Sequence, residues 1–121
     1  MATYENIRTK TGIVGTAITI FRLVSLAADG QMDHTAATAE PHGVACESVS
    51  TVGAAFPYAL PDSGTVKVEA SAAIAVGAQL EAAADGKVVT ASGGVPVGVA
   101  MSAASADGEI IEVQLHVDKL A

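Results

Sequence analysis

Apolar and polar residues alternate most clearly near the end of the chain. One face of this run would carry Ile111, Val113, Leu115 and Val117, and the other Glu112, Gln114 and His116. The segment Thr65-Val66-Lys67-Val68-Glu69 alternates in the same way. A period of two over a few residues is typical of short strands with one buried face.

Turn signals separate these runs. Asp29-Gly30 and Asp85-Gly86 are hairpin-turn dipeptides, because glycine tolerates a positive φ and aspartate caps the turn. Further turns are expected at Asp62-Ser63-Gly64 and Ala106-Asp107-Gly108. We therefore predict a mainly β protein, a small barrel or sandwich of short strands.

The alanine-rich segment from Glu69 to Ala84 is ambiguous. Its composition favours a helix, but Gly77 lies in its middle. We expect a loop, or one helical turn near Ser71 to Ala75, that leads into a strand. The fold then has at most one short helix, and a longer helix here is the alternative.

The chain repeats itself. Ala17-Ile18 and Ala28-Asp29-Gly30 recur as Ala73-Ile74 and Ala84-Asp85-Gly86, at an offset of 56 residues. After a slip of one residue, Gly43-Val44-Ala45 recurs as Gly98-Val99-Ala100. Such order and spacing indicate a duplication, and two copies are too few for a solenoid.

We therefore expect two pseudo-repeated halves, about 17–53 and 73–108, within a single β-rich domain over 16–121. Residues 1–15 contain Arg8 and Lys10 and end in a glycine-containing stretch, so we expect them to form an extended N-terminal arm. The segment 56–61 lies between the predicted copies.

Size and composition limit the core. The chain has 121 residues, and although 50% of them are hydrophobic, only 3% are aromatic. Aromatic rings bury far more surface than alanine or valine, and small domains hide a smaller share of their surface. We expect the protein to gain stability by associating with itself or with a larger surface.

The net charge of −7 argues against nucleic-acid partners, which require basic patches, and against anionic membranes. A single cysteine allows no intrachain disulfide. The first residues do not look like a signal peptide, so synthesis in the cytoplasm is expected.

Candidate chemistry is weak. His42 and Cys46 are four residues apart but lack the further ligands of a structural zinc site. Met101 stands where Cys46 falls in the second copy, which favours packing over nucleophilic catalysis. Glu109 and Glu112 are expected to face solvent. We predict no enzyme, and no catalytic, cofactor-binding or metal-binding residues.

The sequence resembles a known family across roughly residues 16–117. The resemblance rests on the order of segments such as Gly64–Ala70, Ala84–Val88, Pro96–Ala100 and Gly108-Glu109 before a terminal strand. This order is similar to that of the capsid decoration, or cement, proteins of tailed phages. The connection Phe56–Pro61 is longer than that family leads us to expect.

The resemblance implies a structural virion protein on the outer capsid surface. It would bind the major capsid protein of an expanded shell and stabilise contacts between coat subunits as a homotrimer. That family has no catalytic residues to transfer.

Two groups of residues are candidates for these contacts. Tyr4, Arg8 and Lys10 of the arm are candidate coat-protein contacts, with incidental terminal charges as the alternative. Phe56 and Tyr58 are candidate subunit contacts, with core filling as the alternative. Two other functions stay open: a lipoyl-like carrier module modified at Lys87, and a trimeric fibre or adhesin domain.

Overall fold

The computed structural model describes residues 8–61 and 64–116. Its first five strands are β1 (Thr9–Ile13), β2 (Leu23–Leu26), β3 (Met32–His34), β4 (Gly43–Ala45) and β5 (Ala55–Ala59). The next five are β6 (Thr65–Glu69), β7 (Gln79–Ala82), β8 (Val88–Thr90), β9 (Pro96–Ala100) and β10 (Ile110–Leu115). A 3-10 turn, η1 (Ala84–Gly86), joins β7 to β8.

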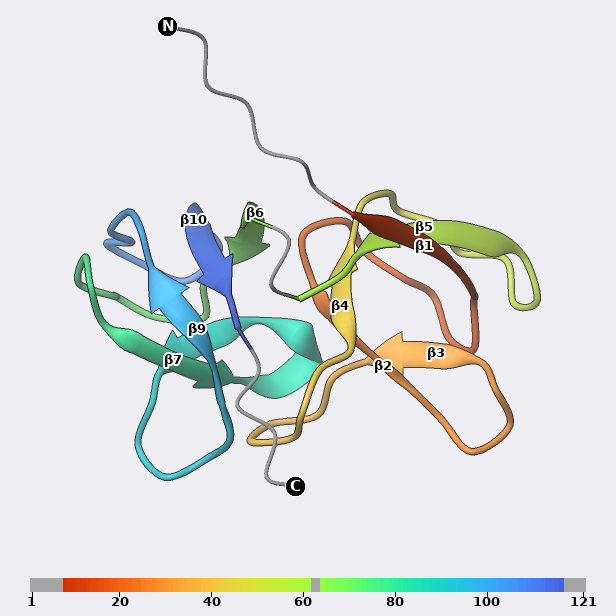
Figure 1. The fold of residues 1–121 in the computed structure, drawn as a ribbon, viewed down its shortest axis with the longest axis horizontal. Coiled ribbons are helices and arrows are strands. Elements are labelled where there is room, and N and C mark those ends of the chain that lie inside the picture. The colour runs from red at the N-terminus through yellow and green to blue at the C-terminus, as the bar shows by residue number, and fades with distance from the viewer. Residues whose placement is uncertain (1–7, 62–63, 117–121) are drawn as a thin grey trace, which may run out of the picture.

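The strands form two five-stranded antiparallel sheets, with the orders β1-β5-β4-β2-β3 and β6-β10-β9-β7-β8. The sheet of β1 to β5 and the sheet of β6 to β10 lie side by side in Figure 1. In each sheet one isolated bridge, Val14–Met32 or Ala70–Val88, links the residue after one edge strand to the other edge strand, without closing a barrel. The mainly β prediction is confirmed, in its sandwich-like form.

The two sheets have the same topology. Strands β1 to β5 correspond one by one to β6 to β10, at an offset of 56 residues up to β3 and 55 from β4 onward. The isolated bridge Ile18–Val49 has its counterpart in Ile74–Ala104. Here, the first half means residues 9–59 and the second half residues 65–115, and counterpart residues are related by these offsets.

The halves are longer than the sequence indicated. Residues 9–13, assigned to an extended arm, form β1 and pair with β5 from Thr9–Ala59 to Ile13–Ala55. Residues 56–59, placed between the copies, lie within β5. The arm prediction is thus corrected from Thr9 onward, and the Phe56–Pro61 segment is mostly strand rather than a long connection. Residues 1–7 lie outside the described residues.

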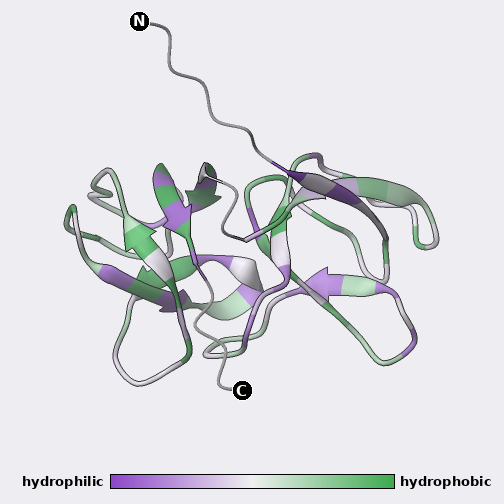
Figure 2. Cartoon of the chain, in the orientation of Figure 1, coloured by the Kyte–Doolittle hydropathy of each residue, from purple (hydrophilic) through white to green (hydrophobic). Residues whose placement is uncertain are grey.

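Burial follows the alternating pattern of the strands. In β10, Ile111, Val113 and Leu115 are buried, whereas Glu112 and Gln114 are exposed. The same alternation of hydropathy along β10 is visible in Figure 2. The hydrophobic core has two clusters, one for each half, and the cluster of the second half also contains Leu23 and Val44 of the first.

The ambiguous alanine-rich segment is a loop that leads into β7, as expected, without the helical turn near Ser71. Asp29-Gly30 and Asp85-Gly86 occupy the β2–β3 and β7–β8 turns, with φ of 85° at Gly30 and 78° at Gly86. Among the described residues there is no helix with the length and apolar character needed to cross a membrane.

Candidate assembly surfaces

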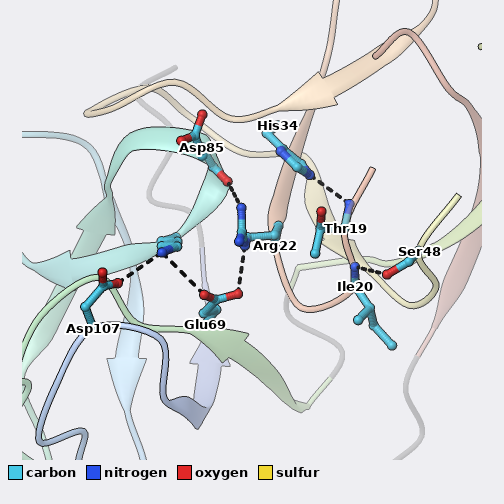
Figure 3. Close-up of polar contacts among 9 residues, drawn as sticks. Thr19, Ile20, Arg22, His34, Ser48, Glu69, Asp85 and Asp107 are labelled. Atoms are coloured by element: carbon cyan, nitrogen blue, oxygen red, sulfur yellow. Dashed lines mark hydrogen bonds and ion pairs between the residues drawn. The ribbon is translucent and has the colours of Figure 1, made fainter. Parts of the chain in front are cut away.

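The two halves meet at a seam with a polar network (Figure 3). Arg22 of the first half donates from Nε to Glu69 Oε1 of the second half at 2.8 Å, and from a terminal nitrogen to the carbonyl of Asp85 at 3.1 Å. The Lys87 ammonium lies 3.4 Å from Glu69 Oε2 and 3.0 Å from Asp107 Oδ1. Because the side chains of Arg22 and Glu69 are only 17% and 16% exposed, this ion pair is partly screened from water.

The network shifts the pKa of the carboxylate at its centre. Partial burial of Glu69 raises its pKa, but the hydrogen bond and positive charge of Arg22, aided by Lys87, outweigh that effect. The pKa of Glu69 therefore lies below its ordinary value. The carboxylate is ionised at neutral pH, which holds the ion pair across the seam together.

Backbone hydrogen bonds cross the same seam. Glu69 N donates to Phe21 O at 2.8 Å, Thr38 N to Ala82 O at 2.9 Å, and Gly86 N to Thr35 O at 3.0 Å.

Phe21 has a φ of 67°, and its counterpart Gly77 also has a positive φ. The left-handed backbone turn was thus kept in the first half at a bulky residue, where it is unfavourable.

Apolar side chains complete the seam. Leu23 and Val44 of the first half are 0% and 2% exposed because they pack into the core cluster of the second half. Beside them is a shallow hollow, which Cys46 and Val66 line from opposite halves. The seam therefore joins the halves through a mixed apolar and ionic contact.

Several large apolar side chains of the described residues stay in solvent. They are Ile13, Leu26, Val52, Val76, Val99, Met101 and Ile110. The most exposed is Val76, at 65%, and the least is Val99, at 36%. Val99 lies beside a second shallow hollow, lined by Gln79, Pro96, Gly98 and His116. Gln79, Val99 and their neighbours thus put apolar and polar groups together at one exposed hollow of the second half.

The predicted coat-contact residues lie at the start of the first half. Arg8 and Lys10 are exposed, and Lys10 belongs to β1, the edge strand of its sheet. Tyr4 lies outside the described residues. Arg8 directly precedes this strand, so two of the three candidate side chains lie close together at the start of the first half.

Phe56 and Tyr58, the candidate subunit contacts, lie in the hydrophobic core. They are 1% and 7% exposed, their ring centroids are 5.9 Å apart, and both belong to the core cluster of the first half. Their rings occupy the space that a side chain at Gly12 would fill. The burial of both rings favours core filling over the subunit contact that was their other interpretation.

Two of the histidines, His34 and His42, accept backbone hydrogen bonds through a ring nitrogen. His34 Nε2 accepts from Thr19 N at 2.9 Å, and His42 Nδ1 accepts from Leu26 N at 3.0 Å. Burial raises the pKa of the half-buried Cys46 thiol, which disfavours the reactive thiolate. Within residues 8–61 and 64–116, no group of three or more His, Cys, Asp or Glu side chains is placed to hold a metal ion.

Two glutamates of the second half hold loops. Glu81 is buried, and its carboxylate accepts from the backbone N–H groups of Ser92 and Gly94 at 2.9 and 2.7 Å. These bonds lower its pKa. Glu109, expected to face solvent, is exposed and accepts hydrogen bonds from the hydroxyl and the N–H of Ser105, which lower its pKa.

Sequence reasoning missed the seam residues Arg22 and Glu69. A signal for them exists in the repeat, because their counterparts are the uncharged Ala78 and Ile13. A charge present in one copy only indicates an ionic contact that the other copy does not make within the chain.

The duplicated sandwich-like fold and its exposed apolar positions are those of a small structural protein built for assembly. The sequence model of the phage cement proteins matches residues 51–115, more than half of the chain, and the chain belongs to this family. The match covers β5 to β10, which include the whole second half. The protein is a structural component of a phage capsid.

One solved structure has a similar fold over almost the whole chain. It is the crystal structure of the N base of head fiber gp8.5 of bacteriophage phi29, with a TM-score of 0.76 and 22% sequence identity, covering 95% of this chain and 98% of that one. At this identity the likeness concerns the fold. The search of curated proteins gives no match.

Proposed function

We propose that the protein binds the outer surface of an expanded phage capsid and stabilises contacts between coat subunits, as a homotrimer. The observation that carries the proposal is the match to the cement protein family over residues 51–115. Many weak contacts repeated over a shell give avidity without one strong site. A capsid that binds the folded chain and not the unfolded chain also stabilises the fold by mass action.

The strand edge at β1 is the proposed coat-protein contact. Arg8 and Lys10 are exposed there, in a chain whose net charge is −7. Since an edge strand offers backbone N–H and C=O groups as well as side chains, β1 suits docking on a partner surface. Tyr4 stays a candidate for the same contact.

Self-association is proposed from the apolar positions that the single chain leaves in solvent. Seven large apolar side chains of the described residues are exposed, up to 65% at Val76. Burying part of this set would supply some of the stability that a core poor in aromatic rings does not provide. A trimer is the state that the family resemblance implies.

Binding is tested by co-sedimentation with expanded and unexpanded capsids of the phage that encodes the protein. We expect the chain to pellet with expanded capsids. We also expect R8Q and K10Q to weaken pelleting by roughly threefold to tenfold each, because each change removes one exposed charge contact. The matched control is K67Q, which removes a charge from the exposed Lys67 on β6, the counterpart strand of β1.

A chain that stays in the supernatant with expanded capsids would contradict capsid binding. If K67Q and K10Q lose pelleting equally, β1 is not the specific contact, although the protein still binds capsids. These two results separate the function from the assignment of its surface.

A second candidate is a trimeric fibre domain. The fold likeness to the N base of the phi29 head fiber favours it, since the two chains correspond over nearly their full lengths. Because that relative is the base of a fiber on a phage head, such a domain should also pellet with capsids, and co-sedimentation alone does not separate the two candidates. They differ in their effect on the shell: a cement protein should raise the temperature at which expanded capsids open, measured by access of a dye to the DNA, whereas a fibre base should leave that temperature unchanged.

The carrier alternative has less support. Its modified residue would be Lys87, but the ammonium of this lysine lies between the carboxylates of Glu69 and Asp107, and its side chain is only 21% exposed. A modifying enzyme needs a lysine whose amine is free. Lys87 is instead part of the seam.

A further inference from the structure

We propose that a second copy of this chain docks head-to-tail, with the open face of its first half on the open face of the second half. This inference rests on the self-association part of the proposed function and names the surfaces that it uses. It is drawn from the seam inside each chain, which shows how one half of this fold receives another.

The seam joins two different surfaces. The first half contributes Arg22, Leu23 and Val44, and the second half contributes Glu69 and the region around Gly86. Because the two sides differ, the contact is heterologous: each half carries one surface of each kind, and only one of them is used within the chain. The repeat therefore leaves one unused surface on each half.

The unused surface of the second half is the counterpart of the one that the first half buries. We define the second-half open face by Val76, Ala78, Gln79, Val99 and Met101. The counterparts of the last four are Arg22, Leu23, Val44 and Cys46, all of which lie at the seam. Val99 and Met101 are 36% and 48% exposed, whereas Val44 is 2% exposed.

The unused surface of the first half is its matching partner. We define the first-half open face by Ile13, Leu26 and Gly30, the counterparts of Glu69, Ala82 and Gly86. Ile13 and Leu26 are 38% and 53% exposed, whereas Ala82 is 1% exposed.

The two counterpart glycines show the same contrast. A Cβ built on Gly86 would lie 2.5 Å from Leu23 O, because the first half presses against this turn. A Cβ on Gly30 would have nothing within 4 Å. The turn at Gly30 is thus an unoccupied copy of a docking position.

The open faces are chemically complementary. Where the seam pairs Arg22 with Glu69, the open faces offer Ala78 and Ile13, so the ionic contact is replaced by an apolar one. Val76, Val99 and Met101 add exposed apolar side chains to one face, and Leu26 adds one to the other. Four of the seven exposed large apolar side chains, Ile13, Leu26, Val99 and Met101, have counterparts at the seam.

This head-to-tail contact can also close into a ring of identical chains. A heterologous contact that repeats by rotation closes into a ring. In a homotrimer, seams within chains and docked contacts between chains would alternate around the ring. The halves would then form a continuous layer that lies flat on a capsid.

The test copies the internal ion pair into the docked contact. I13E and A78R each put one charge on an open face, whereas the double variant I13E/A78R should reproduce the pair that Arg22 and Glu69 make at the seam. Each half already tolerates these residues at the counterpart positions, so the fold should persist, as unfolding by urea would verify. Self-association is measured by sedimentation velocity and light scattering.

We expect each single variant to weaken self-association by at least about tenfold, because it buries an unpaired charge, and the double variant to recover to within about threefold of the original chain. The control is V52D. Val52 is 61% exposed and belongs to neither open face. Its counterpart is an aspartate, Asp107, so this change should leave self-association unaltered.

Two results would overturn the proposal. If both single variants assemble as well as the original chain, the open faces are not the contact, although trimerisation and capsid binding stand. If the double variant assembles no better than the single ones, Ile13 and Ala78 do not face each other. A chain that is monomeric at about 100 μM refutes self-docking, while co-sedimentation still tests capsid binding separately.

Discussion

The two halves of the chain share strand order, turns and bridges, yet they hide different surfaces. Leu23 in β2 is fully buried because the second half covers it, whereas its counterpart Gln79 in β7 is exposed. Gly86 is pressed against the first half, whereas Gly30 lies open. A duplicated unit can therefore fix one contact inside the chain and keep the same geometry available outside it.

The cores of the halves are filled in different ways. The first half packs Met32, Phe56 and Tyr58 where the second half has the smaller Val88, Ile111 and Val113. The extra volume is offset on β1, because Gly12 stands where the second half has the buried Val68. The two copies thus reach close packing with different sizes at corresponding positions.

The largest expected effect comes from the seam. Leu23→Ala should lower the free energy of unfolding by about 3 kcal/mol, because it leaves a cavity where the halves meet. The counterpart change Gln79→Ala should cost less than about 0.5 kcal/mol, since Gln79 is exposed. Urea unfolding of the two variants, compared with the original chain below the concentration of self-association, checks the difference.

Equal losses for the two variants would mean that the halves are not held together as the structure shows. A second outcome is also informative. If L23A unfolds in two steps, the halves have separate stabilities, and the seam is the weaker contact between two cores.

The repeat was predictable because identities are preserved at a tight turn and at a close approach of two strands. Asp-Gly and Gly-Val-Ala lie where the backbone allows few residues: Gly43 and Gly98 approach the next strand so closely that a Cβ would be 2.3 Å from Ala59 O and Gln114 O respectively. Sequence similarity survives at such positions. It was lost in β1 and β5, where Gly12 and the aromatic rings replaced the aliphatic residues of the other copy.

Pro57 also concealed β5, since proline rarely occurs within a strand that has neighbours on both sides. The structure explains why it is tolerated. The counterpart of Pro57 is Glu112, whose N–H donates to Ser102 Oγ rather than to a neighbouring strand. This position therefore needs no N–H for the sheet, and a proline there costs no ladder bond.

The seam was not predictable from one sequence. Arg22 and Glu69 are 47 residues apart, and no local pattern joins them. What the pattern did predict was the need for partners, because composition alone showed a core poor in large side chains. The surfaces that meet at the seam are determined by side chains that differ between the copies. The contact between those side chains can be recognised only when the halves are placed together.

The second prediction tests the exchange of volume between the halves. Gly12→Val gives β1 the residue of its counterpart and should destabilise the protein by about 2 kcal/mol, because a Cβ at this position would lie 2.5 Å from Met32 Sδ. Met32→Val, again the counterpart residue, should cost about 1 kcal/mol by leaving space.

The double variant G12V/M32V should then cost less than the sum of the single changes, by at least about 0.5 kcal/mol, because the new side chain fills the space left by the other. Urea unfolding of the original chain, the two single variants and the double variant gives this double-mutant cycle. Strict additivity would show that β1 does not pack against Met32 as its counterpart packs in the second half.

The smallest expected effect concerns a histidine that only the first half has. His34 Nε2 accepts a hydrogen bond from Thr19 N, and its counterpart is Thr90. Partial burial lowers the pKa of His34, and so does the positive charge of Arg22, although Asp85 and Asp33 act in the opposite sense. Since the folded pKa lies below the ordinary 6.5, the neutral imidazole stabilises the fold fully above that value, and this stabilisation is lost as the pH falls through the folded pKa.

The original chain should therefore lose stability between about pH 7 and pH 5 more steeply than His34→Gln, whose amide oxygen accepts the same bond without titrating. Glu69 contributes little to the difference, because its lowered pKa puts its own loss at more acidic pH. Melting temperatures of both proteins across this range give the comparison. Parallel curves would show that the first half does not depend on a neutral His34, and that the loop at Thr19 is held by other contacts, as its counterpart in the second half must be.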